Sequence, residues 1–335
     1  MLRNLKYKRR PSMTGYPESL IQKYVLFLFF MLLFTQAAVA QPLQMVKTIP
    51  VGKGPDALFL TPDENFLYVA NVEDNFVSVI DTRKDTVVQT IQDVNYPWGF
   101  SRLGRSHLVA VSGWDKGVYV IDSRAHQIVR QKRYEQNLGG IASSSEGKTL
   151  FVVGTAVNQV FKIDAATLEI VDSSATGNGP DGVGISGDDS KIYVTNTRDG
   201  TISIIRLKNK KTQLIRTGGK PELIHYNHDH SCLFISNFLK NKIHILDTGT
   251  DKIIHEITGL DGPEEAVLSP DETRLYVVNF NRSLIYVYDA KTFRKLPQEY
   301  RAGTKPIGVM PVKKGNKLYV SNYGDNSVGV MKLQP

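Results

Sequence analysis

Cysteine and long apolar runs are both scarce in this sequence, and each scarcity excludes a class of protein. Cys232 is the only cysteine among 335 residues. An intramolecular disulfide and a cysteine-rich zinc or iron–sulfur site are therefore excluded. No run of about 18 apolar residues is present, so no transmembrane helix is expected in the processed chain. The sequence also lacks a Gly-x-Ser-x-Gly elbow and a His-Glu-x-x-His pair, and we predict no catalytic residue.

Positive charge is concentrated at the N-terminus. The chain has a formal net charge of +8, but residues 1–40 hold six Lys or Arg against Glu18. The remainder has 35 basic and 32 acidic residues, a charge of only +3. A strongly basic field of the kind that attracts nucleic acid is therefore not expected outside the first forty residues.

Residues 1–40 have the organisation of a secretory signal peptide. A basic segment precedes the apolar residues 25–34, which are too few to cross about 30 Å of hydrocarbon as a helix. Ala38 and Ala40 supply the small side chains that signal peptidase requires, so we expect cleavage after Ala40. An uncleaved anchor is the alternative, and either Met1 or Met13 can be the start. A periplasmic or secreted protein follows from this pattern.

One short string recurs seven times along the chain. The copies are LYVAN (67–71), LVAVS (108–112), LFVVG (150–154), IYVTN (192–196), LFISN (233–237), LYVVN (275–279) and LYVSN (318–322), spaced 41 to 43 residues apart. A second apolar string follows each copy, and five of these end in an Asp: Asp81, Asp122, Asp164, Asp247 and Asp289. With a strand before and a strand after these two strings, each repeat predicts four antiparallel strands, here called A to D.

The ends of the repeat region indicate how the fold closes. The seventh repeat stops after its third strand, whereas residues 44–49 supply a spare outer strand ahead of the first repeat. We therefore predict an all-β, seven-bladed β-propeller over residues 41–335, in which this N-terminal strand joins the last blade. An open solenoid would need polar capping repeats, and none is visible.

These repeats resemble the YVTN-repeat β-propellers, including the periplasmic YncE-like proteins, over about residues 44–335. The resemblance implies a fold more than a function, because similar repeats occur in lactonases, in the haem d1 domain of nitrite reductases and in surface-layer proteins. Blades 2 and 3 depart from the pattern, with Ser112 and Gly154 where the other five copies have Asn. The Asn residues themselves are interpreted as turn-formers.

Acidic residues follow the start of strand A in several repeats. Because strand A is innermost, we expect five carboxylates to converge at one mouth of the central channel: Asp56, Asp181, Glu222, Glu264 and Glu265. Such a ring could hold a cationic ligand or a divalent cation. The alternative is that each carboxylate caps nearby backbone N–H groups. No resident cofactor is predicted.

The B-to-C loops should emerge on the same face as these carboxylates. They add five candidate ligand-binding residues: Trp114, Arg198, Phe238, Arg282 and Tyr323. Trp98, at the start of strand A in blade 2, completes the predicted site, although packing between blades is an equally ordinary role for it.

A histidine cluster and a basic strip are the other candidates for chemistry. His225, His228, His230 and Cys232 lie close in sequence, but the repeat places His228 and His230 in an A-to-B turn on the opposite face, so no metal site is predicted. The strip from Arg206 to Lys220 holds six basic residues and no acid. It is the feature that would serve binding of single-stranded nucleic acid.

Taken together, the sequence favours an exported, non-enzymatic propeller that binds a small ligand, a peptide or a protein loop at the mouth formed by the D-to-A and B-to-C loops. The first alternative is a lactonase-like, metal-assisted hydrolase that uses the mouth carboxylates. The second alternative is binding of single-stranded nucleic acid, as the resemblance to YncE-like proteins implies. A monomer without a membrane span after signal cleavage is expected.

Overall fold

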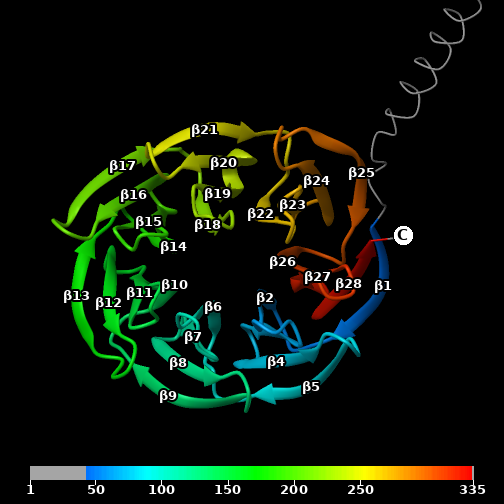
Figure 1. Ribbon diagram of the computed structural model, residues 1–335, viewed down its shortest axis with the longest axis horizontal. Helices are drawn as coiled ribbons and strands as arrows, with labels where there is room; N and C mark the ends of the chain where they lie inside the picture. Colours follow the sequence, from blue (N-terminus) through cyan, green and yellow to red (C-terminus); the bar gives the residue numbers. More distant parts are fainter. Residues whose placement is uncertain (1–42, 334–335) are drawn as a thin grey trace, which may run out of the picture. The chain divides into compact units, whose positions relative to one another are not determined.

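Each copy of the repeat folds into one antiparallel sheet of four strands, and seven such blades form a ring (Figure 1). A computed structural model describes residues 43–333 of the chain. The predicted signal peptide, residues 1–40, lies outside the described residues. Among the residues that the structure describes, no helix has the length and apolar character needed to cross a bilayer. The seven-bladed β-propeller predicted from the repeats is confirmed.

Strands A and B are the two inner strands of each blade, and strand A borders the channel. Strand A, the innermost, is β2 (Pro55–Leu60), β6 (Pro97–Arg102), β10 (Leu138–Ser143), β14 (Pro180–Ile185), β18 (Pro221–Tyr226), β22 (Pro263–Leu268) and β26 (Pro306–Val312) in successive blades. Strand B, which carries the recurring string, is β3 (Phe66–Asn71), β7 (Leu108–Gly113), β11 (Thr149–Gly154), β15 (Lys191–Asn196), β19 (Cys232–Asn237), β23 (Arg274–Asn279) and β27 (Lys317–Asn322).

The two outer strands complete each blade. Strand C is β4 (Phe76–Asp81), β8 (Gly117–Asp122), β12 (Gln159–Asp164), β16 (Thr201–Arg206), β20 (Lys242–Asp247), β24 (Leu284–Asp289) and β28 (Ser327–Leu333). Strand D is β5 (Thr86–Ile91), β9 (Gln127–Arg133), β13 (Ile170–Ala175), β17 (Lys211–Arg216), β21 (Lys252–Ile257), β25 (Lys295–Arg301) and, for the last blade, β1 (Leu43–Pro50). Short 3-10 helices η1 (Phe238–Lys240) and η2 (Tyr323–Asp325) form two of the B-to-C loops.

The ring is closed by its first strand. β1 pairs antiparallel with β28, with Leu43 opposite Leu333 and Pro50 opposite Ser327. The last sheet therefore has the order β1-β28-β27-β26 and joins the two ends of the described chain. This is the closure that the spare N-terminal strand predicts.

Strands B and C are buried on both faces, which explains why their apolar residues occur in runs instead of alternating. Between blades 1 and 7, for example, Leu67 and Ile80 pack in one buried cluster with Tyr319 and Val328. Each interface between blades has a cluster of this kind, and the core is therefore a ring of seven layers. A strand that contacts a blade on either side needs apolar side chains in both directions.

The strand pairing in blade 2 shows that the sequence alignment of this repeat is shifted by one residue. Pro97 pairs with Gly113, so Gly113 and not Ser112 stands at the position of the recurring Asn. The LVAVS string is thus placed one residue too early. A Cβ at Gly113 would lie 2.3 Å from the carbonyl oxygen of Asn95, and this contact excludes Asn at that position. Gly154 of blade 3 does stand at the Asn position, as predicted.

The C-to-D turns connect neighbouring blades through buried polar groups. Asp251, at such a turn, accepts hydrogen bonds from Lys191 Nζ at 2.7 Å, Tyr193 Oη at 2.9 Å and Arg206 Nη2 at 2.9 Å. Its carboxylate is buried and both oxygens are occupied. Blades 4 and 5 are therefore held together by a fully satisfied charge network.

The same turn position recurs at other interfaces. Asp85 accepts hydrogen bonds from Lys317 Nζ at 2.7 Å and from Tyr319 Oη, and joins blade 1 to blade 7. His126 takes this position in blade 2, where its Nδ1 lies 2.7 Å from Tyr68 Oη. The tyrosines of the recurring string thus serve to join the blades.

Candidate ligand-binding site

Every strand A carries one extra residue near its start. In β2, Pro55 pairs with Asn71 and Leu58 with Val69, so three steps along β2 match two steps along β3. The same shift occurs in all seven blades. A β-bulge of this kind bends the strand and redirects side chains. Here the bulge residues lie beside the central channel, and most of the predicted acidic residues are among them.

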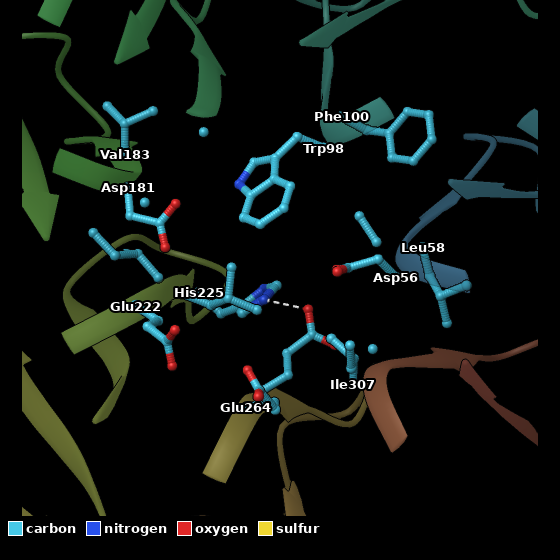
Figure 2. A pocket seen from close by; sticks show the side chains of 18 of the residues that line it. Asp56, Leu58, Trp98, Phe100, Asp181, Val183, Glu222, His225, Glu264 and Ile307 are labelled. Carbon is cyan, nitrogen blue, oxygen red and sulfur yellow. Dashed lines mark ion pairs between the residues drawn. The ribbon is translucent and has the colours of Figure 1, made fainter. Parts of the chain in front are cut away.

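A cavity of about 460 Å³ occupies the channel at this end of the ring (Figure 2). All seven strand A segments contribute to its wall, together with three residues from adjoining loops: Lys220, Phe280 and Tyr323. Its ionisable side chains include Asp56, Asp181, Glu222, His225, Glu264 and Glu265, and its apolar side chains include Leu58, Trp98, Phe100, Ile141, Val183 and Ile307. The lining therefore combines a set of acids with an apolar and aromatic surface.

The Ser or Thr hydroxyl at the fourth position of the recurring string holds the backbone of the bulges by hydrogen bonds. Thr195 Oγ1 accepts the Gly182 N–H at 2.8 Å and donates to the carbonyl oxygen of Glu222 in the next blade at 2.5 Å. Ser321 Oγ likewise donates to the carbonyl oxygen of Asp56 at 2.6 Å. The backbone that carries two of the cavity acids is therefore held from the neighbouring blade. No pattern in the sequence indicates this role, because Thr and Ser are ordinary strand residues.

The recurring Asn residues hold the loops that lead into strand A. Asn237 Oδ1 accepts the Lys220 N–H at 2.9 Å, and Asn322 Oδ1 accepts the Gly303 N–H at 2.9 Å. Both side chains are buried. These bonds agree with the interpretation of the Asn series as residues that shape loops, and they fix the backbone from which Lys220 reaches the cavity.

Glu222 is the most buried of the charged residues that line the cavity. Only 7% of it is exposed, and Oε1 forms an ion pair with Lys220 Nζ. Its other oxygen, Oε2, is buried and has no hydrogen-bond partner among the described residues. Burial raises the pKa of Glu222, and the ammonium of Lys220 opposes part of that rise.

Three further carboxyl groups lie deep in the wall and repel each other. Burial and the charges of Glu265, Asp181 and Glu222 raise the pKa of Asp56 to about 7. Burial, followed by Glu222, raises the pKa of Asp181 to about 6. Burial and the charges of Glu222 and Asp56 raise the pKa of Glu264 to about 9. At neutral pH the cavity therefore holds protonated as well as ionised carboxyls.

His225 enters the cavity, where it contacts Glu265. The distance from Nε2 to Oε1 is 2.6 Å, and Oε2 of Glu265 accepts the backbone N–H of Val309. As the repeat predicted, His228 and His230 lie in the turn at the other end of β18, away from the cavity. The sequence analysis counted Lys220, just before Pro221, in the basic strip and gave neither it nor His225 a place in the cavity. Neither residue shows a motif that would have identified it.

Trp98 forms the centre of the aromatic wall. Its indole N–H donates a hydrogen bond to Asp181. The ring stacks on Tyr96 with centroids 6.2 Å apart and lies 5.4 Å from the ring of Trp114. Three aromatic side chains thus support one another, and Trp98 is the member that faces the cavity.

The predicted site residues divide into two groups. Those that line the cavity are Asp56, Trp98, Asp181, Glu222, Glu264, Glu265 and Tyr323. Those that do not are Trp114, Arg198, Phe238 and Arg282. Arg282 pairs with Asp261 at 3.2 Å, and Phe238 packs against Phe280 with centroids 6.0 Å apart. Of the B-to-C loop residues predicted for the site, only Tyr323 reaches the cavity, and the order of strands alone does not predict which of them do.

The acidic and histidine side chains of the described residues form no cluster suited to a metal ion. Within residues 43–333, no three His, Cys, Asp or Glu side chains come close enough together to hold one. The cavity carboxyls are spread around the wall on separate blades, so they do not form a ready-made ligand set for the divalent cation considered from the sequence.

No family model matches the chain. Antigen Lp49 of Leptospira interrogans serogroup Icterohaemorrhagiae serovar copenhageni is 25% identical over 254 residues, which are 68% of this chain and 55% of that protein. The match thus spans about half the length of this curated relative. The resemblance to YVTN-repeat propellers stays a prediction from the repeats.

Solved structures show the same architecture. A hydrazine synthase chain from Kuenenia stuttgartiensis superposes with a TM-score of 0.73 at 19% identity, covering 83% of this chain and 95% of that one. The β-propeller domain of Cps50 (Swd1) from Myceliophteria thermophila gives a TM-score of 0.75 at 11% identity, covering 88% and 100%. These likenesses show the fold.

Proposed function

We propose that this chain is a non-enzymatic binding protein that takes a small ligand into the central cavity. The observation that carries the proposal is the cavity itself, about 460 Å³ in volume, in which a buried carboxylate oxygen of Glu222 lacks a partner beside an aromatic wall. Ligand sites are commonly concave, of this size and mostly apolar, with a few polar groups that fix orientation. Seven packed blades hold the lining in place, so little conformational entropy is lost on binding.

The lactonase-like alternative receives less support. No Ser, Thr or Cys lines the cavity, and the hydroxyl of Tyr323, which does line it, donates to Glu73. A metal-assisted mechanism needs ligands that converge on one ion, and the described residues do not supply three. His225 and Glu265 could hold and move a proton, but they lack a nucleophile to activate.

The basic strip gives nucleic-acid binding little support. Arg206 binds the buried Asp251, Lys210 pairs with Asp172 at 2.6 Å, and Lys220 turns into the cavity. Three of its six basic residues are therefore engaged by carboxylates of this chain. The remaining charges amount to an ordinary exposed outer strand, where Lys and Arg guard against edge pairing.

Export completes the proposal. The signal peptide predicted at residues 1–40 would deliver the propeller to the periplasm or the medium as a monomer. Fractionation of the producing cells, followed by N-terminal sequencing of the exported form, tests this part. A processed chain that begins at Gln41 is the expected result, and retention of the unprocessed chain in the cytoplasm would contradict it.

Binding in the cavity is tested by a thermal-shift screen. The purified protein is mixed with neutral, anionic and cationic compounds that fit the volume, and each hit is repeated with Ala57→Phe, which fills the cavity from β2. We expect hits that raise the Tm of the unmodified protein and leave the variant unchanged. The ligand-free Tm of the variant shows that it folds. A screen without hits in any charge class, or hits that the variant retains, would contradict the proposal.

A further inference from the structure

We propose that the ligand is an organic cation with N–H donors and an apolar body, such as an alkyl amine or diamine, held between the cavity carboxyls and the aromatic wall. This inference rests on the proposed binding function and adds the chemical class of the ligand.

The acids of the cavity outnumber the cations that can neutralise them. Lys220 and His225 are the basic side chains in the wall, and they already pair with Glu222 and Glu265. The other three carboxyl groups have no ion-pair partner among the described residues: Asp56, Asp181 and Glu264. A cation that enters the cavity would therefore meet carboxyls that Lys220 compensates only in part and without a direct ion pair.

The unpaired oxygen of Glu222 indicates independently which kind of cation the cavity would bind. Its Oε2 is buried, belongs to a residue that is 7% exposed, and has no hydrogen-bond partner among residues 43–333. An unpaired buried acceptor destabilises the folded protein, more so when it is charged, unless something donates to it. A primary ammonium has three N–H donors, whereas a quaternary ammonium has none. The unfilled acceptor therefore favours an amine.

The opposite wall is suited to a carbon chain. Figure 2 shows Trp98 and Phe100 on the side of the cavity away from Glu264, with Leu58 between them and Ile307. The face of an indole ring also attracts cations. An alkyl amine placed with its nitrogen toward Glu222 would cover these rings with its methylene groups and bury apolar area.

The proposal predicts that ligand affinity depends on pH, because binding is linked to the protonation of the cavity carboxyls. The ionisable groups that face the ligand are Asp56, Asp181, Glu222, Glu264, Glu265, Lys220, His225 and Tyr323. Carboxyls with raised pKa values, about 6 for Asp181, 7 for Asp56 and 9 for Glu264, are protonated at low pH and attract no cation in that form. Rising pH ionises them while an alkyl amine stays charged up to about pH 10. Affinity should therefore rise from pH 6 to pH 9, and binding should release protons.

Four compounds with the same five-carbon chain distinguish the effect of the ligand's charge on affinity from the effects of its N–H donors and its shape. Isothermal titration calorimetry of the full purified protein at about pH 8 compares 1,5-diaminopentane, pentylamine, pentyltrimethylammonium and 1,5-pentanediol. We expect the two amines to bind at least about tenfold more tightly than the quaternary ion and the neutral diol, which is the effect of a charge-assisted hydrogen bond of about 1.4 kcal/mol or more. We also expect diamine affinity to rise by at least about tenfold between pH 6 and pH 9.

Glu222→Gln is the decisive variant. It keeps the shape but removes the charge, so we expect amine affinity to fall by at least about tenfold while the diol is unaffected. Equal binding of diol and diamine, or unchanged amine affinity in the variant, would overturn the inference. If neutral or anionic compounds bind in a manner blocked by Ala57→Phe while the amines do not, the inference fails and the proposed function stands. If no compound binds, both fail.

Discussion

Two sets of buried carboxyl groups in this propeller have opposite surroundings. At the outer turns, Asp85 and Asp251 each receive a lysine and a tyrosine from the neighbouring blade. At the inner ends of strand A, Asp56 and Glu264 face other acids and form no ion pair among the described residues, although the ammonium of Lys220 opposes part of the rise in the pKa of Glu264. Burial is common to both sets, so the difference lies in what the fold supplies. A satisfied carboxylate supports the structure, whereas an unsatisfied one is a liability that a ligand could relieve.

The largest change in the free energy of unfolding is expected when a carboxylate with a full set of hydrogen-bond partners is removed. Asp251→Ala leaves Lys191 and Arg206 without their partner, and we expect the free energy of unfolding to fall by about 3 kcal/mol or more. Urea denaturation measures the loss. Asp172→Ala, which removes an exposed ion pair with Lys210, is the matched control and should change the unfolding free energy much less. Equal losses would remove the distinction between the two sets.

Removing an unsatisfied carboxylate should raise the free energy of unfolding instead of lowering it. The pKa of Glu264 is raised to about 9 in the folded chain, so the folded state holds this proton more tightly than the unfolded state. Stability from this group is therefore present at low pH and is lost as pH rises from about 4.5 toward 9. We expect Glu264→Gln to match the unmodified protein near pH 5 and to exceed its unfolding free energy by on the order of 2 kcal/mol at pH 9. A variant less stable at pH 9 would refute this.

The aromatic wall can be tested separately from the charges. Trp98→Ala should weaken pentylamine binding by roughly tenfold, about 1.4 kcal/mol, because the indole face is lost. Trp114→Ala is the control, since Trp114 touches Trp98 but does not line the cavity. Calorimetry at one pH compares the two. A larger loss in the control would place the ligand outside the cavity.

The smallest effect is expected at a neutral contact between blades. Tyr68→Phe removes the hydrogen bond to His126, and we expect a loss of about 1 kcal/mol in unfolding free energy. Ligand binding should stay the same because this contact lies at an outer turn. Thermal denaturation with and without diamine measures both quantities, and a change in affinity would link regions that the comparison separates.

The fold could be predicted because its signals are local and repeated. Strings such as IYVTN mark strand B in each blade, and the spare strand before the first repeat indicates the closure. The error in blade 2 has a simple cause: residues 108–113 are apolar or small throughout, so an alignment shifted by one residue still matches the pattern. Only the cross-strand pairing identifies Gly113 as the counterpart of Asn.

The site could be predicted only in part. The acids just after the start of strand A could be found because the bulge recurs at one place in every repeat. His225 was missed because its counterpart in blade 6 is the apolar Val267, and the contact with Glu265 joins residues 40 positions apart in different blades. Arg282, predicted as a ligand-binding residue of the same face, does not line the cavity, and nothing local in the sequence shows that it pairs with Asp261. Contacts between blades depend on packing that a single repeat does not encode.

A crystal structure of the protein with 1,5-diaminopentane would decide whether the unsatisfied carboxyls form the binding site. We predict one ligand nitrogen within hydrogen-bond distance of Glu222 Oε2, with the carbon chain against Trp98. A cavity that holds only water while the diamine occupies the outer surface would contradict the distinction between the two sets of carboxyls.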